Sequence, residues 1–168
     1  MVSLHEFALA IQSVYSPFQT DEFIKSIFDS TWDGLELKGR IRQISINLGK
    51  YLPADFQAAL TVIDKVILNY GGIGKFCFPD FIEVYGQDDI NWDLSINALA
   101  RYTPYASSEF AVRPFIIKQE AAMMTQTYAW SRDENEHLRR LASESSLPQL
   151  PWGQALSKFK KEREEALR

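Results

Sequence analysis

The sequence predicts an all-α fold, specifically an α-solenoid in which antiparallel helix pairs stack side by side. Apolar residues recur at helical spacing over most of the chain, and clear strand signals are absent. The nearest strand candidate, residues 73–78, is short and interrupted by glycine. The pattern indicates about eight or nine helices of roughly ten to seventeen residues, each with one apolar stripe. A compact helical bundle fits the same pattern, so that architecture stays open.

The first half of the chain contains three helices with regular apolar faces. Thr20, which precedes two acidic residues, is expected to cap the first of them. Its inward residues are Phe23, Ile27 and Phe28. The stripe of the second is Leu37, Ile41, Ile44, Leu48 and Leu52. Pro53 marks the start of the third helix and Gly71-Gly72 its end. The stripe of that helix is Phe56, Leu60, Ile63, Ile67 and Tyr70.

The second half continues the helical pattern after Pro114. One predicted stripe runs through Ile117, Ala121, Met124 and Tyr128. The next helix has an apolar edge made by Leu138, Leu141 and Ala142. After residue 152 lysine and glutamate alternate, which is typical of an exposed helix held by i, i+4 pairs or of a frayed end.

Composition points to one domain, residues 1–168, in a reducing cytoplasm. The single cysteine, Cys77, excludes a disulfide framework and a cysteine-based zinc site. The N-terminal residues do not form a targeting signal, and no apolar run reaches the ~18 residues of a membrane span. We therefore expect a cytoplasmic protein that does not enter a membrane.

The charge pattern leaves two interpretations open. A net charge of −4 argues against a generic nucleic-acid binder, and residues 1–36 carry six acidic side chains against one lysine. Basic residues cluster elsewhere, at Lys38, Arg40 and Arg42 and again at Arg139 and Arg140. Because the local field rather than net charge steers a phosphate backbone, these clusters can form a basic stripe on an acidic body. The alternative is a scatter of solvated charges.

Familiar catalytic motifs are missing from the sequence. It has no P-loop, no G-x-G-x-x-G and no H-E-x-x-H motif. The two histidines, His5 and His137, are too few for a histidine-rich metal site. We therefore expect neither a metal nor another cofactor.

Two compact blocks, residues 107–115 and 130–152, each combine carboxylate, cation and aromatic residues. In the second, Glu144 shares a helix stripe with Arg140 and His137. In the first, Glu109 follows two serines and is expected in the first turn of a helix. Both glutamates also fit structural roles, as part of an i, i+4 charge ladder and as a residue matched to the helix dipole. Trp152 either plugs a gap between helix pairs or lies on the surface.

These blocks, in order, resemble the AlkC branch of the HEAT-like-repeat DNA alkylation repair glycosylases. The segments that carry the resemblance are L-E-L-K-G-R-I-R-Q-I (35–44), Y-L-P-A-D-F (51–56), S-S-E-F-A-V-R-P-F (107–115), W-S-R-D-E-N-E-H-L-R-R-L-A-S-E (130–144) and L-P-Q-L-P-W (147–152). The resemblance implies a solenoid of HEAT-like helix pairs whose concave basic face cradles duplex DNA. It also implies monofunctional excision of cationic N-alkylated bases such as 3-methyladenine, without swinging the lesion into a deep pocket.

Carried over residue by residue, the resemblance makes Glu109 and Glu144 the catalytic carboxylates and places Trp152 near the sugar of the lesion. It implies that Arg140 and Arg113 orient those carboxylates or contact phosphate. The further candidates for contacts with DNA are Arg139, Lys38 and Arg42. A cationic base is already a good leaving group, so the carboxylates are needed to stabilise an oxocarbenium-like sugar rather than to donate a proton.

The chain departs from the family pattern at its C-terminal end. Family members continue past the L-P-W block into further helices, and this chain ends at Arg168. We therefore expect an N-terminal part of a longer architecture, or a short relative. A non-catalytic HEAT-like module that binds DNA or a protein partner remains the alternative. Self-association through an uncovered solenoid end is a further expectation, because such ends need caps.

Overall fold

The computed structural model describes residues 4–70, 73–147 and 153–156. Within these ranges the chain is helical and contains no strand, which confirms the predicted all-α fold. The α-helices are α1 (Leu4–Val14), α2 (Thr20–Ile27), α3 (Leu37–Tyr51), α4 (Phe56–Asn69), α5 (Cys77–Tyr85), α6 (Trp92–Tyr102), α7 (Arg113–Lys118), α8 (Glu120–Trp130) and α9 (Glu136–Ser145). Short 3₁₀ helices are η1 (Trp32–Gly34), η2 (Ile73–Phe76) and η3 (Asp89–Asn91). Several of these helices are shorter than predicted.

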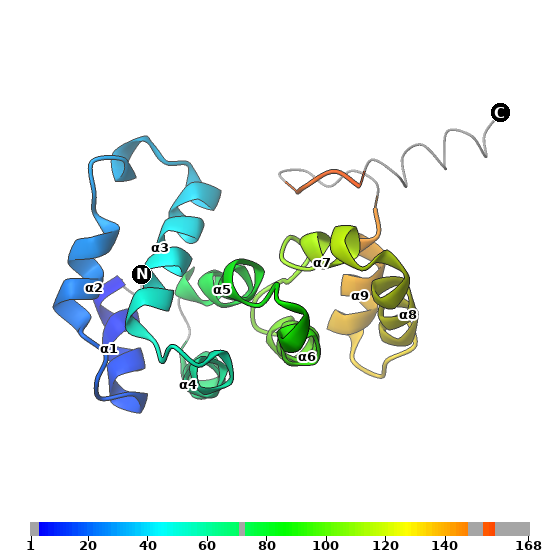
Figure 1. Ribbon diagram of the computed structural model, residues 1–168, viewed down its shortest axis with the longest axis horizontal. Helices are drawn as coiled ribbons and strands as arrows, with labels where there is room; N and C mark the ends of the chain where they lie inside the picture. Colours follow the sequence, from blue (N-terminus) through cyan, green and yellow to red (C-terminus); the bar gives the residue numbers. More distant parts are fainter. Residues whose placement is uncertain (1–3, 71–72, 148–152, 157–168) are drawn as a thin grey trace.

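The helices follow one another along the long axis of the molecule, from α1–α3 at one end to α8 and α9 at the other (Figure 1). Each packs on close neighbours: α3 on α5, α5 on α6, α7 on α8, and α8 on α9. Because each helix pair is covered by the next, one apolar core runs through the whole array. The arrangement is the predicted solenoid of stacked helix pairs.

Close packing fixes the distance between neighbouring helices at two points. The buried ring of Phe7 lies 5.3 Å from the Tyr70 ring and 5.5 Å from the Phe78 ring, centroid to centroid, and so joins α1 to α4 and α5. At the α3–α5 contact, a Cβ added to Gly49 would lie 2.2 Å from the Tyr85 ring. Only glycine allows α3 and α5 to approach this closely, and these two helices carry part of the candidate site.

Of three predicted helix faces, one is confirmed and two hold only in part. The α4 stripe is confirmed, but Leu37 on α3 is 57% exposed, and with the half-buried Ile41 it faces an open cleft. Phe28 is 52% exposed instead of inward, because its ring packs on Trp32 at a centroid distance of 4.9 Å.

The predicted helix starts at Thr20 and Pro53 are wrong by one to three residues. Gln19 is the N-cap residue of α2, and Thr20 is already helical. Helix α4 begins after Asp55, whose side chain accepts a hydrogen bond from the Ala58 amide at 2.8 Å. The aspartate cap, and not the proline, sets this start. The helix ends at Asn69, and Gly71-Gly72 lie outside the described residues.

The stripe predicted after Pro114 is wrong, because two helices occupy this segment. Gln119 separates α7 from α8, with φ −137° and ψ 66°, and this break changes which faces are buried. Ile117 and Tyr128 are therefore 52% and 58% exposed. The residues buried instead are Phe115, Ile116, Met123, Thr127 and Trp130.

Candidate active site

Two clefts meet along one side of the array. The large cleft, about 780 Å³, lies between the first half of α3, helix α5 and the turn at residues 107–111. The small cleft, about 350 Å³, lies between residues 103–107 and helix α9. Phe76 and Ser107 line both clefts. The point where the clefts meet is the region in which the predicted carboxylates lie.

Glu109 and Glu144 face each other across this meeting point. Glu109 lines the large cleft and Glu144 the small one, and each carboxyl group shifts the pKa of the other. Arg140 bridges them, since its Nε donates to Glu144 Oε1 at 2.8 Å and its Nη2 lies 3.9 Å from Glu109 Oε2. Ser107 Oγ donates to Glu109 Oε2 at 2.9 Å. The structure thus brings the two predicted carboxylates and one predicted arginine together.

Local structure positions each carboxylate differently. Glu109 lies in a turn four residues before α7, and not in the first turn of a helix as predicted. Ser108 anchors this turn, because its hydroxyl donates to the Leu99 carbonyl at 3.0 Å. Glu144 lies in the last turn of α9, a helix capped by Asn135. One carboxylate therefore depends on packing against α6, and the other on helix geometry.

The two glutamates have opposite pKa shifts. Burial raises the pKa of Glu109 above its ordinary value, and the hydrogen bond with Glu144 raises it further. The hydrogen bond from Arg140 lowers the pKa of Glu144. Of the two groups, Glu109 therefore binds a proton more readily than Glu144 does. The pair can therefore offer one anion and one group that exchanges a proton.

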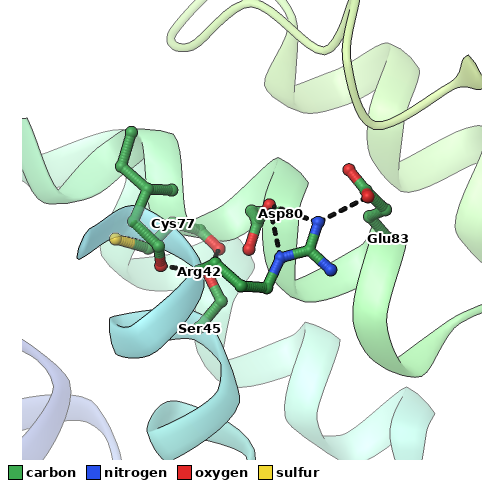
Figure 2. A network of polar contacts seen from close by, with 6 residues as sticks. Arg42, Ser45, Cys77, Asp80 and Glu83 are labelled. Atoms are coloured by element: carbon green, nitrogen blue, oxygen red, sulfur yellow. Dashed lines mark hydrogen bonds and ion pairs between the residues drawn. The ribbon is translucent and has the colours of Figure 1, made fainter. Parts of the chain in front are cut away.

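Two cations on α3, Lys38 and Arg42, were predicted to contact DNA, and one of them is bound to carboxylates. Arg42 forms ion pairs with Asp80 at 3.0 Å and with Glu83, both from α5 (Figure 2). Burial raises the pKa of Asp80 and of Glu83 although Arg42 opposes the shift. Lys38 instead faces the large cleft, with its Nζ 5.0 Å from the centroid of the Phe110 ring. The surroundings of Lys38 and Arg42 therefore differ, and their contacts with DNA stay predictions.

Sequence reasoning missed this ion-pair network because its members are distant in the chain. Asp80 and Glu83 are one turn apart on α5, but Arg42 lies 38 and 41 residues earlier. Beside them, Ser45 Oγ donates to the Cys77 carbonyl at 3.0 Å and ties α3 to α5 (Figure 2). The i, i+3 spacing of the two acids was the only available signal. Asp80 and Glu83 line the large cleft together with two further carboxylates, so that four carboxylates line it: Glu36, Asp80, Glu83 and Glu109.

Two further arginines have backbone partners, and they differ in exposure. Arg113 is 0% exposed, and its guanidinium donates to the carbonyls of Ser145, at 3.2 Å, and of Gln154. Because its surface is covered, Arg113 is not placed to contact phosphate, and the alternative role of orienting the carboxylates stays a prediction. Arg139 is exposed and donates to the carbonyls of Asp133 and Glu134, both at 2.8 Å. Trp152 lies outside the described residues.

These features define a class of protein: an α-solenoid with a guanidinium-bridged carboxylate pair where two clefts meet. Among the described residues, no group of three or more histidines, cysteines or acids is placed to hold a metal, and no helix is long and apolar enough to cross a bilayer. No protein-family model matches the chain.

Two known proteins are similar to this chain over most of its length. The uncharacterized protein YhaZ of Bacillus subtilis (strain 168) is 39% identical over 150 residues, which cover 89% of this chain and 42% of YhaZ. The structure of Pseudomonas fluorescens alkylpurine DNA glycosylase AlkC, bound to DNA containing an abasic site analog, matches with a TM-score of 0.87 and 32% identity. That match covers 96% of this chain and 44% of AlkC. The chain is an AlkC-type protein, and it spans less than half the length of these two relatives.

Proposed function

We propose that this chain acts in DNA repair as a glycosylase that excises cationic N-alkylated bases, such as 3-methyladenine, from duplex DNA. The observation that carries the proposal is the Glu109–Arg140–Glu144 arrangement at the junction of the clefts. The similarity to an alkylpurine DNA glycosylase supports the same class of substrate.

In the proposed reaction the bond between C1′ and the base nitrogen breaks, and its electron pair leaves with the base. The cationic base becomes neutral, and positive charge develops on the sugar. The Glu144 carboxylate stabilises that charge; a carboxylate about 4 Å from a unit charge gains roughly 4 kcal/mol at an effective dielectric near 20. If half of this gain is specific to the transition state, the rate rises about thirtyfold.

Glu109 has the second role in the proposed reaction. A water molecule attacks C1′ through its oxygen, and its proton passes to the ionised Glu109 carboxylate. Because burial raises the pKa of Glu109, the group exchanges a proton more readily near neutral pH than an ordinary glutamate does. Ser107 orients this carboxylate through its hydrogen bond at 2.9 Å.

The carboxylates must act close to DNA phosphates, which repel them. Arg140 offsets this repulsion, because its side chain is 62% exposed while it binds Glu144. We propose that Lys38 at the large cleft and Arg139 on the exposed side of α9 add phosphate contacts. Each such contact should steepen the plot of the logarithm of the binding constant against the logarithm of the salt concentration by about one unit of slope.

The test is release of 3-methyladenine from methylated duplex DNA by the wild type, Glu109→Gln and Glu144→Gln. Glu136→Gln is the matched control, because Glu136 is an exposed acid in the first turn of the same helix as Glu144. We expect release by the wild type and the control, and a loss of at least about tenfold in the other two variants. Equal release by all four proteins would remove the glutamates from the mechanism.

A second candidate function is non-catalytic binding of DNA or of a protein partner. The four carboxylates that line the large cleft and the net charge of −4 favour a protein partner over DNA in this alternative. A salt titration separates the two kinds of partner, since binding through phosphates weakens steeply with salt. Self-association stays a prediction, which sedimentation of the chain at several concentrations tests.

A further inference from the structure

We propose that Phe76, supported by Tyr105 and Lys75, is an apolar wedge that contacts the base pair next to the damaged nucleotide. The inference rests on the proposed function and adds to it a residue that separates stacked bases. Phe76 is the last residue of η2, directly before α5, and its side chain is 45% exposed.

Phe76 occupies the position where such a wedge is needed. It lines the large cleft together with Glu109 and the small cleft together with Glu144. A sugar held at the carboxylate pair would therefore have its neighbouring base step close to this ring, since successive nucleotides are about 3.4 Å apart along the helix axis. An exposed apolar residue is ordinary by itself, but this one lines both clefts, beside the two carboxylates.

A second exposed ring and a cation flank Phe76. Tyr105, 41% exposed, lines the small cleft beside Phe76. The Nζ of Lys75 lies 5.6 Å from the centroid of the Tyr105 ring. A cation next to aromatic rings suits a nucleic acid, because the rings can stack on bases while the cation neutralises a nearby phosphate.

The backbone next to Phe76 packs closely against the hydrophobic core. Gly74 in η2 lies against the buried Phe7, so closely that an added Cβ would be 2.7 Å from the Phe7 ring. Phe7 is itself packed against Tyr70 and Phe78. The exposed Phe76 ring therefore projects from a well-packed turn. A wedge needs such support, because separating stacked bases costs free energy that a loosely held side chain cannot supply.

Two other exposed aromatic residues provide matched controls. Phe28 is 52% exposed and packs on Trp32, and Tyr128 is 58% exposed with the Arg132 guanidinium 4.2 Å from its ring centroid. Neither residue lines the large or the small cleft. Phe28→Ala therefore controls for Phe76→Ala, and Tyr128→Ala for Tyr105→Ala.

The experiment uses a duplex that contains a stable abasic-site analogue with 2-aminopurine in the adjacent position. Binding of the wild type should raise 2-aminopurine fluorescence, because the base loses a stacking neighbour. Phe76→Ala should abolish this rise and weaken binding by at least about fivefold. Phe76→Leu should retain most of the rise, since an apolar wedge remains. Thermal melting of each variant checks that it is folded.

The outcomes separate this inference from the proposed function. Salt-sensitive binding by Phe76→Ala with an undiminished fluorescence rise overturns the wedge and leaves the proposed function standing. An equal loss in Phe28→Ala also overturns it, because the effect would then be independent of the clefts. A wild type that does not bind the duplex overturns both proposals.

Discussion

Replacing Arg113 by methionine removes a buried guanidinium and keeps a long side chain of similar reach. In the structure Arg113 is 0% exposed and donates to the carbonyls of Ser145 and Gln154. One side chain therefore holds the end of α9, next to Glu144, and the segment at residues 153–156. Burial lowers the pKa of Arg113, a sign that its desolvation has a cost.

The expected loss of stability follows from these contacts. A hydrogen bond from a charged donor contributes about 1.5–3 kcal/mol, and two such bonds contribute roughly 3–6 kcal/mol. Relief of the buried charge offsets part of this, so the net loss for Arg113→Met should be about 3 kcal/mol. For a chain of this size that loss lowers the melting temperature by about 6–12 °C.

Urea unfolding followed by far-ultraviolet circular dichroism measures the effect. Arg139→Met is the matched control, because Arg139 also donates to two backbone carbonyls, but at an exposed turn where water can replace it. We expect the control to lose less than about 1 kcal/mol. Arg113→Lys should be intermediate, because an ammonium group keeps the charge but not the fork of donors. A loss below about 1 kcal/mol in Arg113→Met would refute this reasoning.

Three further predictions concern the site and the helices that carry it. In Arg140→Met, the pKa values of Glu109 and Glu144 should both rise because a nearby positive charge is lost. The acid limb of the pH–activity profile should therefore move to higher pH by about half a pH unit. The control variant Arg132→Met should leave this limb unchanged. Gly49→Ala should lower the free energy of unfolding by about 1–3 kcal/mol in a urea titration, because its Cβ would overlap an aromatic ring; Gly34→Ala, with nothing within 4 Å of its Cβ, should be near neutral. In Arg42→Met, the raised pKa values of Asp80 and Glu83 should rise further. The native state then binds more protons than the unfolded state, so the loss of stability relative to the wild type, measured by urea unfolding, should shrink as pH falls from about 7 to 5. A loss that grows over this range would contradict the expected sign.

Helices whose pattern is set locally were predicted well from the sequence, and those set by distant contacts were not. The α4 stripe is continuous because its apolar spacing has no interruption. At the break between α7 and α8, Asp89 in η3 pairs with Lys118 at 2.9 Å and accepts a hydrogen bond from Gln119 at 3.1 Å. Those partners are about thirty residues apart in the chain, and no local spacing indicates them.

The same distinction applies to the candidate site. Arg140 and Glu144 are one helical turn apart, so their ion pair could be predicted from spacing. Glu109 was placed beside them by a family resemblance, because nothing local joins residues 109 and 144. Arg42 was assigned to DNA on its charge and helix position, and Arg113 was assigned to the carboxylates or to phosphate by the family resemblance. Their partners come from other helices and from the backbone, which charge patterns do not reveal.

The most direct test of the account is a double-mutant cycle on the two carboxylates, read as the single-turnover rate of 3-methyladenine release. We expect Glu109→Gln and Glu144→Gln each to slow release by about thirtyfold. The double variant should be little slower than the slower single variant, because groups that act as one unit lose their effect together. Losses that multiply in the double variant, or full activity in either single variant, would contradict the carboxylate pair as the centre of the reaction.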